Sequence, residues 1–461
     1  MLKICGIYMH RPNLKTVLSV CAIGILALMT FQQGSNAAAR KIKPADRPNI
    51  IIILADDLGC GDMSLYDGWI KTPRIDQMAR EGIRFTDFHS NSSVCSPTRI
   101  AFMTGRYQQR VGIVDVIVGT RDREGLEPSE ITISGLMKNA GYKTAIFGKW
   151  HCGTHLRHNP TNHGFDEFVG FLTGAGDYHK HGNWMDGAEV KEQKGYSTHI
   201  ITDRSVDFIE RNKDNPFFLY VSHAAVHNPY QTPADTPENR PKVRIRDREH
   251  TRAKYKIMLE ELDKGVGKIL DTLRKHDLEE NTLVFFFSDN GAVHMGANVR
   301  PYRGGKFSNY EGGHRVPAVA RWPGHIKAGW TTDELIVGMD LLPTVTDIAR
   351  IDIPRQRKLD GISVKDHLLN QADLPNRRVF FGYEPKLGTA MRDGHWKMQT
   401  KGDVVELYDL RNDIKETTNI ADKYPKRTEE MKAAIKKWKS DVTAGTTSQR
   451  QATYDTGGRH D

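Results

Sequence analysis

Three unbroken runs of apolar residues constrain the fold of this chain more than any other feature. They lie at residues 50–54, 217–221 and 283–287. A strand with water on one face alternates apolar and polar residues, so a continuous apolar run is typical of a strand buried on both faces. Helical periodicity occurs between these runs, at 198–211 and 255–276. The alternation predicts an α/β fold with a doubly wound, mainly parallel sheet flanked by helices.

The pattern continues outside the three runs and then changes. Further helices are predicted at 72–81 and 131–140, and further strands at 84–88 and 143–147. After about Pro375 the strand-like segments become short and evenly spaced, and a helical segment closes the series; these segments are 378–383, 390–399, 404–408 and 429–442. We therefore predict an α/β domain at 40–375. A smaller antiparallel-sheet-plus-helix subdomain with a loose polar tail is expected at 376–461.

Residues 1–39 resemble a signal peptide. Three basic residues precede an apolar stretch at 17–31, and the small residues Ala37, Ala38 and Ala39 follow it. The stretch is shorter than the roughly 20 residues of a membrane span, so cleavage is favoured over a retained anchor. The mature protein is expected to be secreted or periplasmic, with no stable membrane partner. The full chain has 461 residues and a charge of +9, of which +6 remains after residue 39. That excess suits an anionic substrate as well as simple solubility, and we expect no nucleic-acid partner.

The cysteines are too few for a disulfide framework. Cys60, Cys95 and Cys152 are the ones that follow the predicted signal peptide. Cys95 precedes a helix signal in which Ser96 can act as the N-cap and Pro97 as the first helical residue. A thiol in that position is often reactive. Cys60 and Cys152 are interpreted as small buried residues, with a functional contact or a mutual disulfide as the alternative.

Acidic and amide side chains follow two of the predicted strands. Asp56 and Asp57 come after the first apolar run, and Asp289 and Asn290 come after the run at 283–287. The carboxyl ends of parallel strands form the binding crevice of an open α/β sheet, so these four side chains should converge. Paired, partly buried carboxylates need a cation, and an all-oxygen set suits Ca²⁺, with Mg²⁺ as the second choice. Loop capping is the alternative interpretation.

An ordered set of motifs accompanies these residues. Cys95–Arg99 fits the pattern C-x-P-x-R and is followed by Thr104, Gly105 and Arg106. Around it lie IIILADDLGC at 51–60, GKWH at 148–151, HNP at 227–229, SDNG at 288–291, RGGK at 303–306, EGG at 311–313 and ELYDL at 406–410. From about residue 47 to 422 the chain thereby resembles the type I, formylglycine-dependent sulfatases of the alkaline phosphatase superfamily. In its overall motif style it resembles the bacterial carbohydrate sulfatases.

The resemblance implies a mechanism. Cys95 would be oxidised by a formylglycine-generating enzyme to Cα-formylglycine. The aldehyde would hydrate to a diol, one hydroxyl would attack sulfur, and deprotonation of the other would expel sulfate. Residues Asp56, Asp57, Asp289, Asn290 and an oxygen of modified Cys95 would hold the cation.

The other roles combine this likeness with the chemistry of each side chain. Arg99, about one helical turn after Cys95, would hold the diol. Lys149 and Lys306 would bind the sulfate oxygens. His151 would act as the base and His227 as the acid.

The substrate is the least constrained feature. Asp177, His179, His181 and Trp184 offer hydrogen-bonding groups and one ring that could contact a sugar, although a polar surface loop is the simpler interpretation. We expect a sulfate ester of a carbohydrate, a sulfated polysaccharide or its oligosaccharides. The alternatives are a formylglycine-dependent phosphonate monoester or phosphodiester hydrolase, an arylsulfatase of other specificity, and a sulfated-glycan binder that has lost catalysis. The histidine-rich segments show no regular zinc-ligand spacing, and the basic stretch at 240–252 is interrupted by acids.

Overall fold

The computed structural model describes residues 47–118, 124–236, 238–241, 248–293, 295–383 and 386–444. The predicted signal peptide and the end of the predicted tail lie outside these residues. The proposed boundaries at residues 39 and 375 remain predictions.

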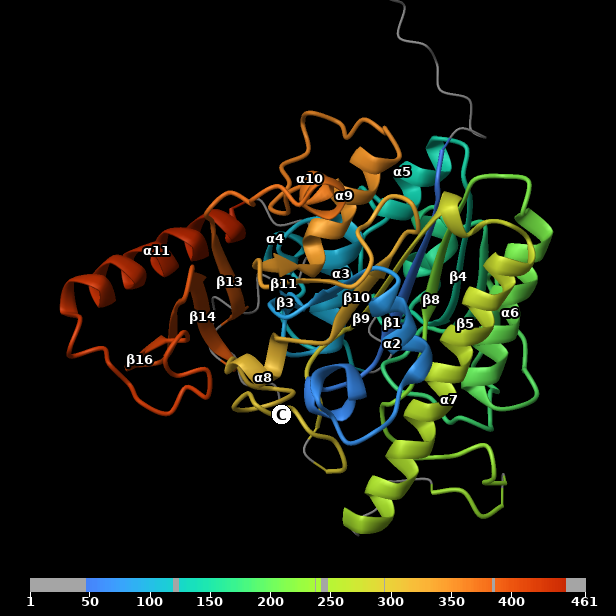
Figure 1. Ribbon diagram of the computed structural model, residues 1–461, viewed down its shortest axis with the longest axis horizontal. Helices are drawn as coiled ribbons and strands as arrows, with labels where there is room; N and C mark the ends of the chain where they lie inside the picture. Colours follow the sequence, from blue (N-terminus) through green and yellow to red (C-terminus); the bar gives the residue numbers. More distant parts are fainter. Residues whose placement is uncertain are drawn as a thin grey trace, which may run out of the picture. The chain divides into compact units, whose positions relative to one another are not determined.

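A ten-stranded sheet forms the centre of the larger domain, in the order β11-β2-β10-β9-β1-β8-β4-β5-β6-β7 (Figure 1). Its core is parallel: β9, β1, β8, β4 and β5 all run the same way. The strands are β1 (Asn49–Ala55), β2 (Ile83–Phe85), β4 (Lys143–Lys149), β5 (Glu167–Phe171), β6 (Met185–Asp186), β7 (Glu189–Val190), β8 (Phe217–Ser222), β9 (Thr282–Ser288), β10 (Ala318–Arg321) and β11 (Trp330–Thr332). The predicted mainly parallel, doubly wound sheet is confirmed. The antiparallel β10 was not predicted, because four residues are too short a run to show a period.

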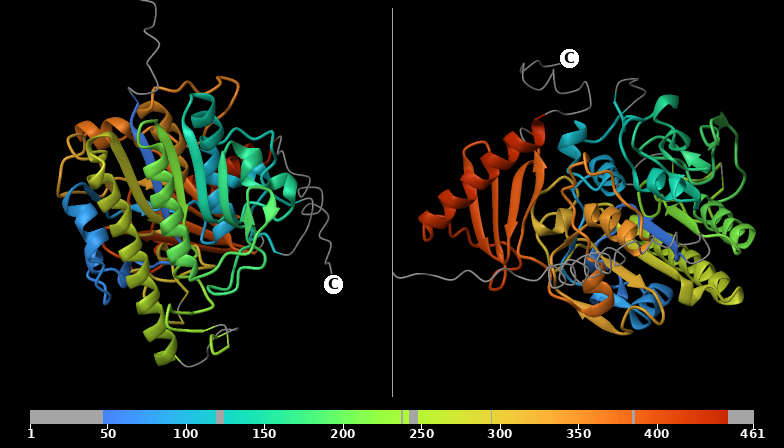
Figure 2. Two further views of the ribbon diagram at one scale, coloured as in Figure 1. Left: turned by 90° about the vertical axis from the view of Figure 1, so that its right-hand side faces the viewer. Right: turned by 90° about the horizontal axis from the view of Figure 1, so that it is seen from above.

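Helices cover both faces of this sheet (Figures 1 and 2). One face carries α2 (Pro73–Arg80), α6 (Ser197–Asn212) and α7 (Arg248–Lys275). The other carries α3 (Cys95–Thr104), α4 (Gln108–Val111), α5 (Ile133–Asn139), α9 (Leu341–Ile348) and α10 (Lys365–Asn370). Short elements join them: α8 (Glu311–His314) and the 3-10 turns η2 (Cys60–Asp62), η3 (Ser64–Tyr66), η4 (Leu156–His158), η5 (Pro160–His163), η6 (Glu279–Asn281) and η7 (Gly338–Asp340).

Strand β1 shows why its sequence is uniformly apolar. Ile50, Ile52 and Leu54 belong to the core beneath α3 and α5, whereas Ile51 and Ile53 belong to the core beneath α6 and α7. All five side chains are fully buried. Each contributes about 1.5–3 kcal/mol through burial, so a polar residue at any of these positions would destabilise one core or the other.

A four-stranded antiparallel sheet lies after the larger domain, in the order β13-β14-β15-β16. Its strands are β13 (Arg378–Tyr383), β14 (Gly388–Asp393), β15 (Trp396–Lys401) and β16 (Val404–Asp409). Helix α11 (Pro425–Thr443) packs along one face, burying Met431, Ile435 and Trp438 against the sheet (Figure 2). The predicted small subdomain is therefore confirmed as an antiparallel sheet with a helix.

Two predicted strands are divided in the structure. The segment 390–399 contains a two-residue turn at Gly394 and His395 that separates β14 from β15, and the φ of +59° at Gly394 favours glycine. The segment 84–88 is likewise divided between β2 and β3 (Phe88–His89), which pairs with β12 (Ile336–Val337) in a separate small sheet. Among the described residues, no helix combines the length and apolarity that crossing a membrane requires.

Candidate functional site

The strand ends of the parallel sheet bring the predicted polar residues together. Asp56 and Asp57 follow β1, Asp289 and Asn290 follow β9, and Lys149 is the last residue of β4. Because these strands are parallel neighbours around β8, their carboxyl ends share one edge of the sheet. This edge lies toward the bottom of Figure 1, near α8.

The acidic residues form one buried cluster. Asn290 donates a hydrogen bond from Nδ2 to Asp57 Oδ1 at 2.7 Å, and the backbone N–H of Asp57 donates to Asp289 Oδ1 at 3.3 Å. Asp56 and Asp57 each offer an oxygen within 4.8 Å of the other and of a His227 ring nitrogen. Asp57 has a φ of +61°, a conformation that aspartate tolerates better than most residues. The predicted convergence of the four strand-end residues is therefore present in the structure.

Each carboxylate of the cluster faces its own positive group. Lys149 Nζ lies 2.5 Å from Asp56 Oδ2, Lys306 Nζ lies 2.6 Å from Asp57 Oδ1, and Arg99 Nη2 lies 2.8 Å from Asp289 Oδ2. Burial by itself raises the pKa of Asp57, but the charge of Lys306 and its hydrogen bond outweigh burial and hold that pKa well below its ordinary range. Burial and the charge of Asp56 raise the pKa of Asp289. Ionisation is therefore favoured at Asp57 and disfavoured at Asp289.

Two buried oxygens of this cluster lack a hydrogen-bond partner among the described residues. They are Asp56 Oδ1 and Asn290 Oδ1, and both side chains are fully buried. Orphaned buried acceptors are costly unless something binds them. Carboxylate and amide oxygens are the ligands that Ca²⁺ and Mg²⁺ prefer, so this donor set fits a hard divalent cation.

Cys95 is the first residue of α3, next to this cluster. The N-cap is Val94 rather than the predicted Ser96, and Ser96 Oγ instead accepts a hydrogen bond from the backbone N–H of Ile117 at 3.1 Å. The Ser96 hydroxyl therefore binds the distant Ile117, although the local sequence predicts that it caps the helix. Burial raises the pKa of the Cys95 thiol although Lys149 and Lys306 oppose the shift. An unmodified thiol here is therefore protonated and a poor nucleophile.

Arg99 links the helix to the acidic cluster. Its side chain is fully buried, and Nη1 donates to the backbone oxygen of Lys149 at 3.0 Å and to Ser222 Oγ at 2.7 Å. Together with the ion pair to Asp289, these contacts fix the guanidinium at the strand ends. Ser222, which ends β8, was missed by the sequence analysis. The rule that singled out Asp56 and Asp289, a polar residue directly after an apolar run, would have found it.

The two predicted catalytic histidines have defined tautomers. His151 Nε2 lies 3.0 Å from the carbonyl oxygen of Ile117, so Nε2 carries the hydrogen and Nδ1 is a buried lone pair with no partner among the residues that the structure describes. Burial, aided by Lys149 and Arg99, lowers the pKa of His151 well below its ordinary value. In His227, Nδ1 donates to the Asn228 oxygen at 2.6 Å, which leaves Nε2 facing Asp57 Oδ2 at 3.6 Å. Burial lowers the pKa of His227 to about 3.

Gly174 leaves room for the His151 ring, and this gives a testable prediction. A β-carbon at residue 174 would lie 2.4 Å from His151 Nε2 and Cε1, so Gly174→Ala must displace the ring from Ile117. Since misplacing a catalytic group by about 1 Å can cost roughly 100-fold, we expect a loss of kcat of about 10- to 100-fold. Steady-state kinetics measure it. Gly176→Ala is the matched control, because its β-carbon makes only an ordinary 3.4 Å contact with Phe171. Equal activity of the two variants would refute the role of Gly174.

The residues predicted to contact a sugar are mostly engaged inside the protein. Asp177 pairs with Arg240 at 2.6 Å, and His179 Nε2 lies 2.9 Å from the Thr232 oxygen. His181 is fully buried, and Trp184 is 1 % exposed, with its ring packed against those of Phe171 and His181. Trp184 therefore has no free face for a sugar, and none of the four residues is carried into the proposed site.

The remaining cysteines and a second histidine cluster carry no reactive site. Cys60 and Cys152 are buried and free, so no disulfide joins them. His89, Glu311 and His314 lie within metal-binding distance of one another and are fully buried. Glu311 is already paired with three cations, which leaves no net negative charge to attract a metal ion. These cations are Arg315 at 3.1 Å, Arg392 at 2.9 Å and Lys397 at 3.0 Å.

This chain is similar to known proteins over most of its length. The family model described as Sulfatase matches residues 48–351, and the one described as N-sulphoglucosamine sulphohydrolase, C-terminal, matches residues 305–443. An arylsulfatase of Hemicentrotus pulcherrimus is 34% identical, over 77% of this chain and 67% of the relative. The human N-acetylgalactosamine-6-sulfatase is 33% identical, over 72% of this chain and 68% of the relative.

Solved structures with the same fold include two crystal structures of Ps i-CgsB. The first has a TM-score of 0.80 and 29% sequence identity, covering 90% of this chain and 98% of that chain. The second, in complex with k-i-k-neocarrahexaose, has a TM-score of 0.80 and 28% identity with the same coverage. The similarity therefore extends over both the larger domain and the small antiparallel sheet.

Proposed function

Since this chain belongs to the sulfatase family and is therefore a sulfuric ester hydrolase, we propose that it hydrolyses a sulfate ester of a carbohydrate. The reaction would use a formylglycine made from Cys95 and a divalent cation, Ca²⁺ or else Mg²⁺. The observation that carries this proposal is the arrangement around Cys95. A buried, protonated thiol opens α3 beside two lysines, two histidines of defined tautomer and two orphaned oxygens.

The cation site would be built by the strand-end residues. Asp56, Asp57, Asp289, Asn290 and an oxygen of modified Cys95 would hold the ion, as the orphaned Asp56 Oδ1 and Asn290 Oδ1 suggest. When bound, the ion supplies Lewis-acid stabilisation of the negative charge on the sulfate oxygens.

The charge of the sulfate group would be met by Lys149 and Lys306. Both ammonium groups already lie at the acidic cluster, and both side chains are nearly or fully buried. In a site from which water is largely excluded, such charges stabilise a transition state strongly, because no reorganisation is needed at the moment of reaction. Arg99, held by Asp289 and Ser222, would fix the start of α3 relative to these lysines.

Proton transfer would involve one nitrogen of each histidine. The lowered pKa of His151 keeps its ring neutral, and Nδ1 has a lone pair without a partner among the described residues. His151 would therefore act as the base that removes a proton, and this deprotonation would expel sulfate. His227 Nε2 faces the cluster and would give a proton to the departing alkoxide. Burial, aided by the charges of Lys306 and Lys149, keeps the pKa of His227 low and the ring neutral, and the negative charge of a bound sulfate would raise this pKa toward the protonated form.

Several observations favour a carbohydrate among possible alcohols. The human relative is an N-acetylgalactosamine-6-sulfatase, and the Ps i-CgsB structure holds a neocarrahexaose. The charge of +6 after residue 39 suits a polyanion. The arylsulfatase relative keeps an aryl sulfate as the second candidate.

We further propose that residues 1–39 direct export and that a formylglycine-generating enzyme matures the protein. We propose no nucleic-acid partner.

A screen of defined sulfated oligosaccharides tests the substrate class. The matured protein is incubated with sulfated galactan and glycosaminoglycan oligosaccharides, an aryl sulfate and the phosphate ester of the same phenol, and the free sulfate or phosphate is measured. We expect kcat/KM for at least one oligosaccharide to exceed that for the aryl sulfate by about 10-fold or more, because binding energy from the sugar is used at the reacting centre. Rapid turnover of aryl sulfate with no glycan hydrolysed would contradict the carbohydrate assignment. Faster phosphate release would favour the phosphoester alternative.

A further inference from the structure

A pocket outside the acidic cluster is lined by segments that neighbour Asp57 and Lys306 along the chain. It has a volume of about 930 Å³ and lies between the turn that follows Asp57 and the loop that leads to Lys306. Its lining includes Gly61 from the first segment, Arg300 and Arg303 from the second, and Lys415 from the segment after β16. We propose that this pocket binds a second anionic sugar unit of the oligosaccharide whose sulfate ester occupies the catalytic site. The inference rests on the proposed function.

The chain connections place the pocket close to the catalytic site. Arg303 is three residues before Lys306, and Lys306 Nζ contacts Asp57 at 2.6 Å. Three residues span at most about 11 Å, even when fully extended. The two walls are also packed together, since a β-carbon at Gly61 would lie 2.8 Å from Asn298 Cγ and 2.9 Å from the Arg300 oxygen. The distance from Arg303 to Lys306 is therefore within the length of a short oligosaccharide.

The charges that line the pocket are available for a ligand. Arg300 and Lys415 are exposed, and neither side chain forms an ion pair or hydrogen bond with another described residue. Arg303 is held in place instead, because Nη1 donates to the Glu416 oxygen at 2.6 Å and the guanidinium lies 3.8 Å from the Tyr310 ring centroid. Three cations face a single acid, Asp67, among the residues that line the pocket. Sulfate or carboxylate is the ligand chemistry that such a set attracts.

Two fixed aromatic rings complete the pocket. The Tyr66 hydroxyl donates to the Phe85 and Ala318 oxygens, at 2.7 and 2.8 Å, in alternative arrangements. The Tyr302 ring is covered by the Arg315 guanidinium at 4.9 Å. Rings held in this way lose little freedom when a sugar packs against them. The combination of ordered rings and unpaired cations is typical of a site for a charged carbohydrate, because the pyranose needs an apolar surface and its anionic substituent needs a cation.

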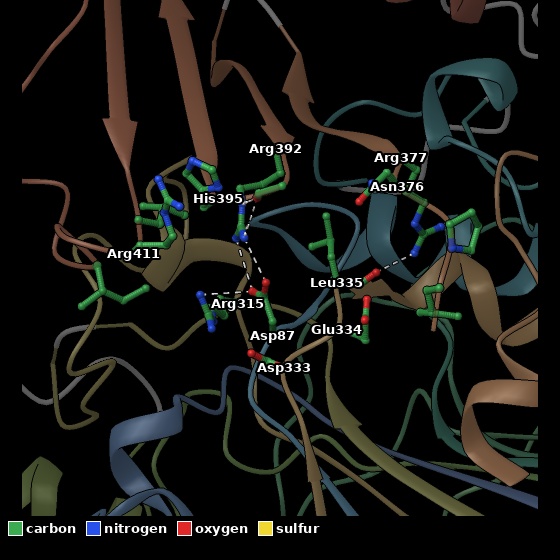
Figure 3. A pocket seen from close by; sticks show the side chains of 15 residues that line it. Asp87, Arg315, Asp333, Glu334, Leu335, Asn376, Arg377, Arg392, His395 and Arg411 are labelled. Carbon is green, nitrogen blue, oxygen red and sulfur yellow. Dashed lines mark hydrogen bonds and ion pairs between the residues drawn. The ribbon is translucent and has the colours of Figure 1, made fainter. Parts of the chain in front are cut away.

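A different pocket, shown in Figure 3, lacks these unpaired charges. Its guanidinium groups point toward protein acceptors. Arg315 and Arg392 pair with Asp87 at 3.1 and 2.9 Å, and Arg377 donates to the Leu335 oxygen at 2.9 Å. Arg411 pairs with Asp409 at 3.3 Å. An anion in that pocket would have to displace internal ion pairs, so the pocket at Arg300 and Lys415 is the better anion site.

Direct binding tests the proposal without requiring turnover. The probes are k-i-k-neocarrahexaose, a heparin hexasaccharide and a neutral agarose hexasaccharide, titrated by calorimetry into full-length protein carrying Cys95→Ala. The test variant adds Arg300→Ala and Lys415→Ala. The control adds Lys143→Ala and Arg355→Ala, which removes the same charge from exposed positions. Lys143 begins β4, at the opposite edge of the sheet from the site.

We expect one sulfated probe to bind about 10-fold more weakly to the test variant, and the control to stay within about twofold. In the matured enzyme, the same pair of substitutions should raise KM for that probe about 10-fold while kcat changes less than about twofold. The sulfated probe that binds more tightly shows whether the pocket prefers a galactan or a glycosaminoglycan. The proposal is overturned by equal affinity of test and control variants, by failure of both sulfated probes to bind, or by equally tight binding of the neutral hexasaccharide. Failure of the proposed function is a separate result, since it appears as absence of sulfate release from every carbohydrate by the matured wild-type protein.

Discussion

Replacing Cys95 by alanine is expected to reduce kcat of the matured enzyme by at least about 10⁴-fold, because the substitution removes the residue from which the proposed formylglycine nucleophile would be made. The reason lies in the state of the thiol itself. Cys95 is 2 % exposed and burial raises its pKa, so the unmodified residue is not a competent nucleophile. Activity should therefore follow the fraction of chains in which Cys95 has been oxidised.

Mass spectrometry measures that fraction independently of activity. Trypsin releases a peptide from Phe85 to Arg99, and its formylglycine form is about 18 Da lighter than the cysteine form. The matched control is Cys60→Ala, another buried free cysteine, whose Sγ donates a weak hydrogen bond to the Arg315 oxygen at 3.8 Å. We expect it to keep activity within about threefold and to lose about 1 kcal/mol of stability. Fully active protein with an unmodified Cys95 peptide would refute the mechanism.

Asp57→Asn is expected to reduce kcat by about 10³-fold and to weaken cation binding, because it removes a charged ligand while preserving shape. Asparagine tolerates the positive φ of residue 57, so the backbone should not change. The variant leaves Lys306 without its carboxylate partner, which can cost up to about 3 kcal/mol of stability. The informative quantity is therefore the Ca²⁺-induced rise in Tm, rather than Tm itself.

The same cation site predicts the effect of chelation on the wild-type protein. Removal of divalent ions should abolish turnover, and Ca²⁺ should restore it best, with Mg²⁺ as a substitute. When the free ion concentration is about 100 times the Kd, binding adds about 2.7 kcal/mol to the free energy of unfolding, which calorimetry or thermal melting detects. Asp277→Asn is the control for the substitution, because Asp277 also has a positive φ, of +55°, and is exposed after α7. Metal-depleted protein with full turnover and no Ca²⁺-induced shift would contradict the cation site.

Much of the fold follows from local sequence because burial on both faces of a strand leaves no choice of residue type. The runs that became β1, β8 and β9 are apolar at every position because alternate residues face different cores. The same argument does not reach β10 or β11, which are only four and three residues long. Their position in the sheet depends on pairing with β9 and β2, and no local period records such pairing.

The features of the candidate site likewise fall into those that the sequence predicts and those that it does not. Strand-end acids and the motif around Cys95 could be found from sequence, because parallel strands end at one edge and a short motif keeps its residues close. The tautomer of His151 could not be predicted, since Ile117, which sets it, is 34 residues away. The start of the helix at Cys95 could not be predicted from local sequence either. Ser96 Oγ accepts a hydrogen bond from the backbone N–H of Ile117 and does not cap the helix.

The sequence by itself determined the class of sheet and the identity of the residues at its edge, and it singled out Cys95 as the residue to be tested for modification. Those features depend on residue type and spacing along the chain, which burial and the geometry of strands restrict directly. Only the tertiary structure decided which cation neutralises each carboxylate, which histidine nitrogen is free, and that Trp184 is enclosed by Phe171 and His181. It also left Arg300 and Lys415 in one pocket without a side-chain partner among the described residues. Such choices depend on distances and orientations among side chains from separate elements, and packing sets those only when the whole core has formed.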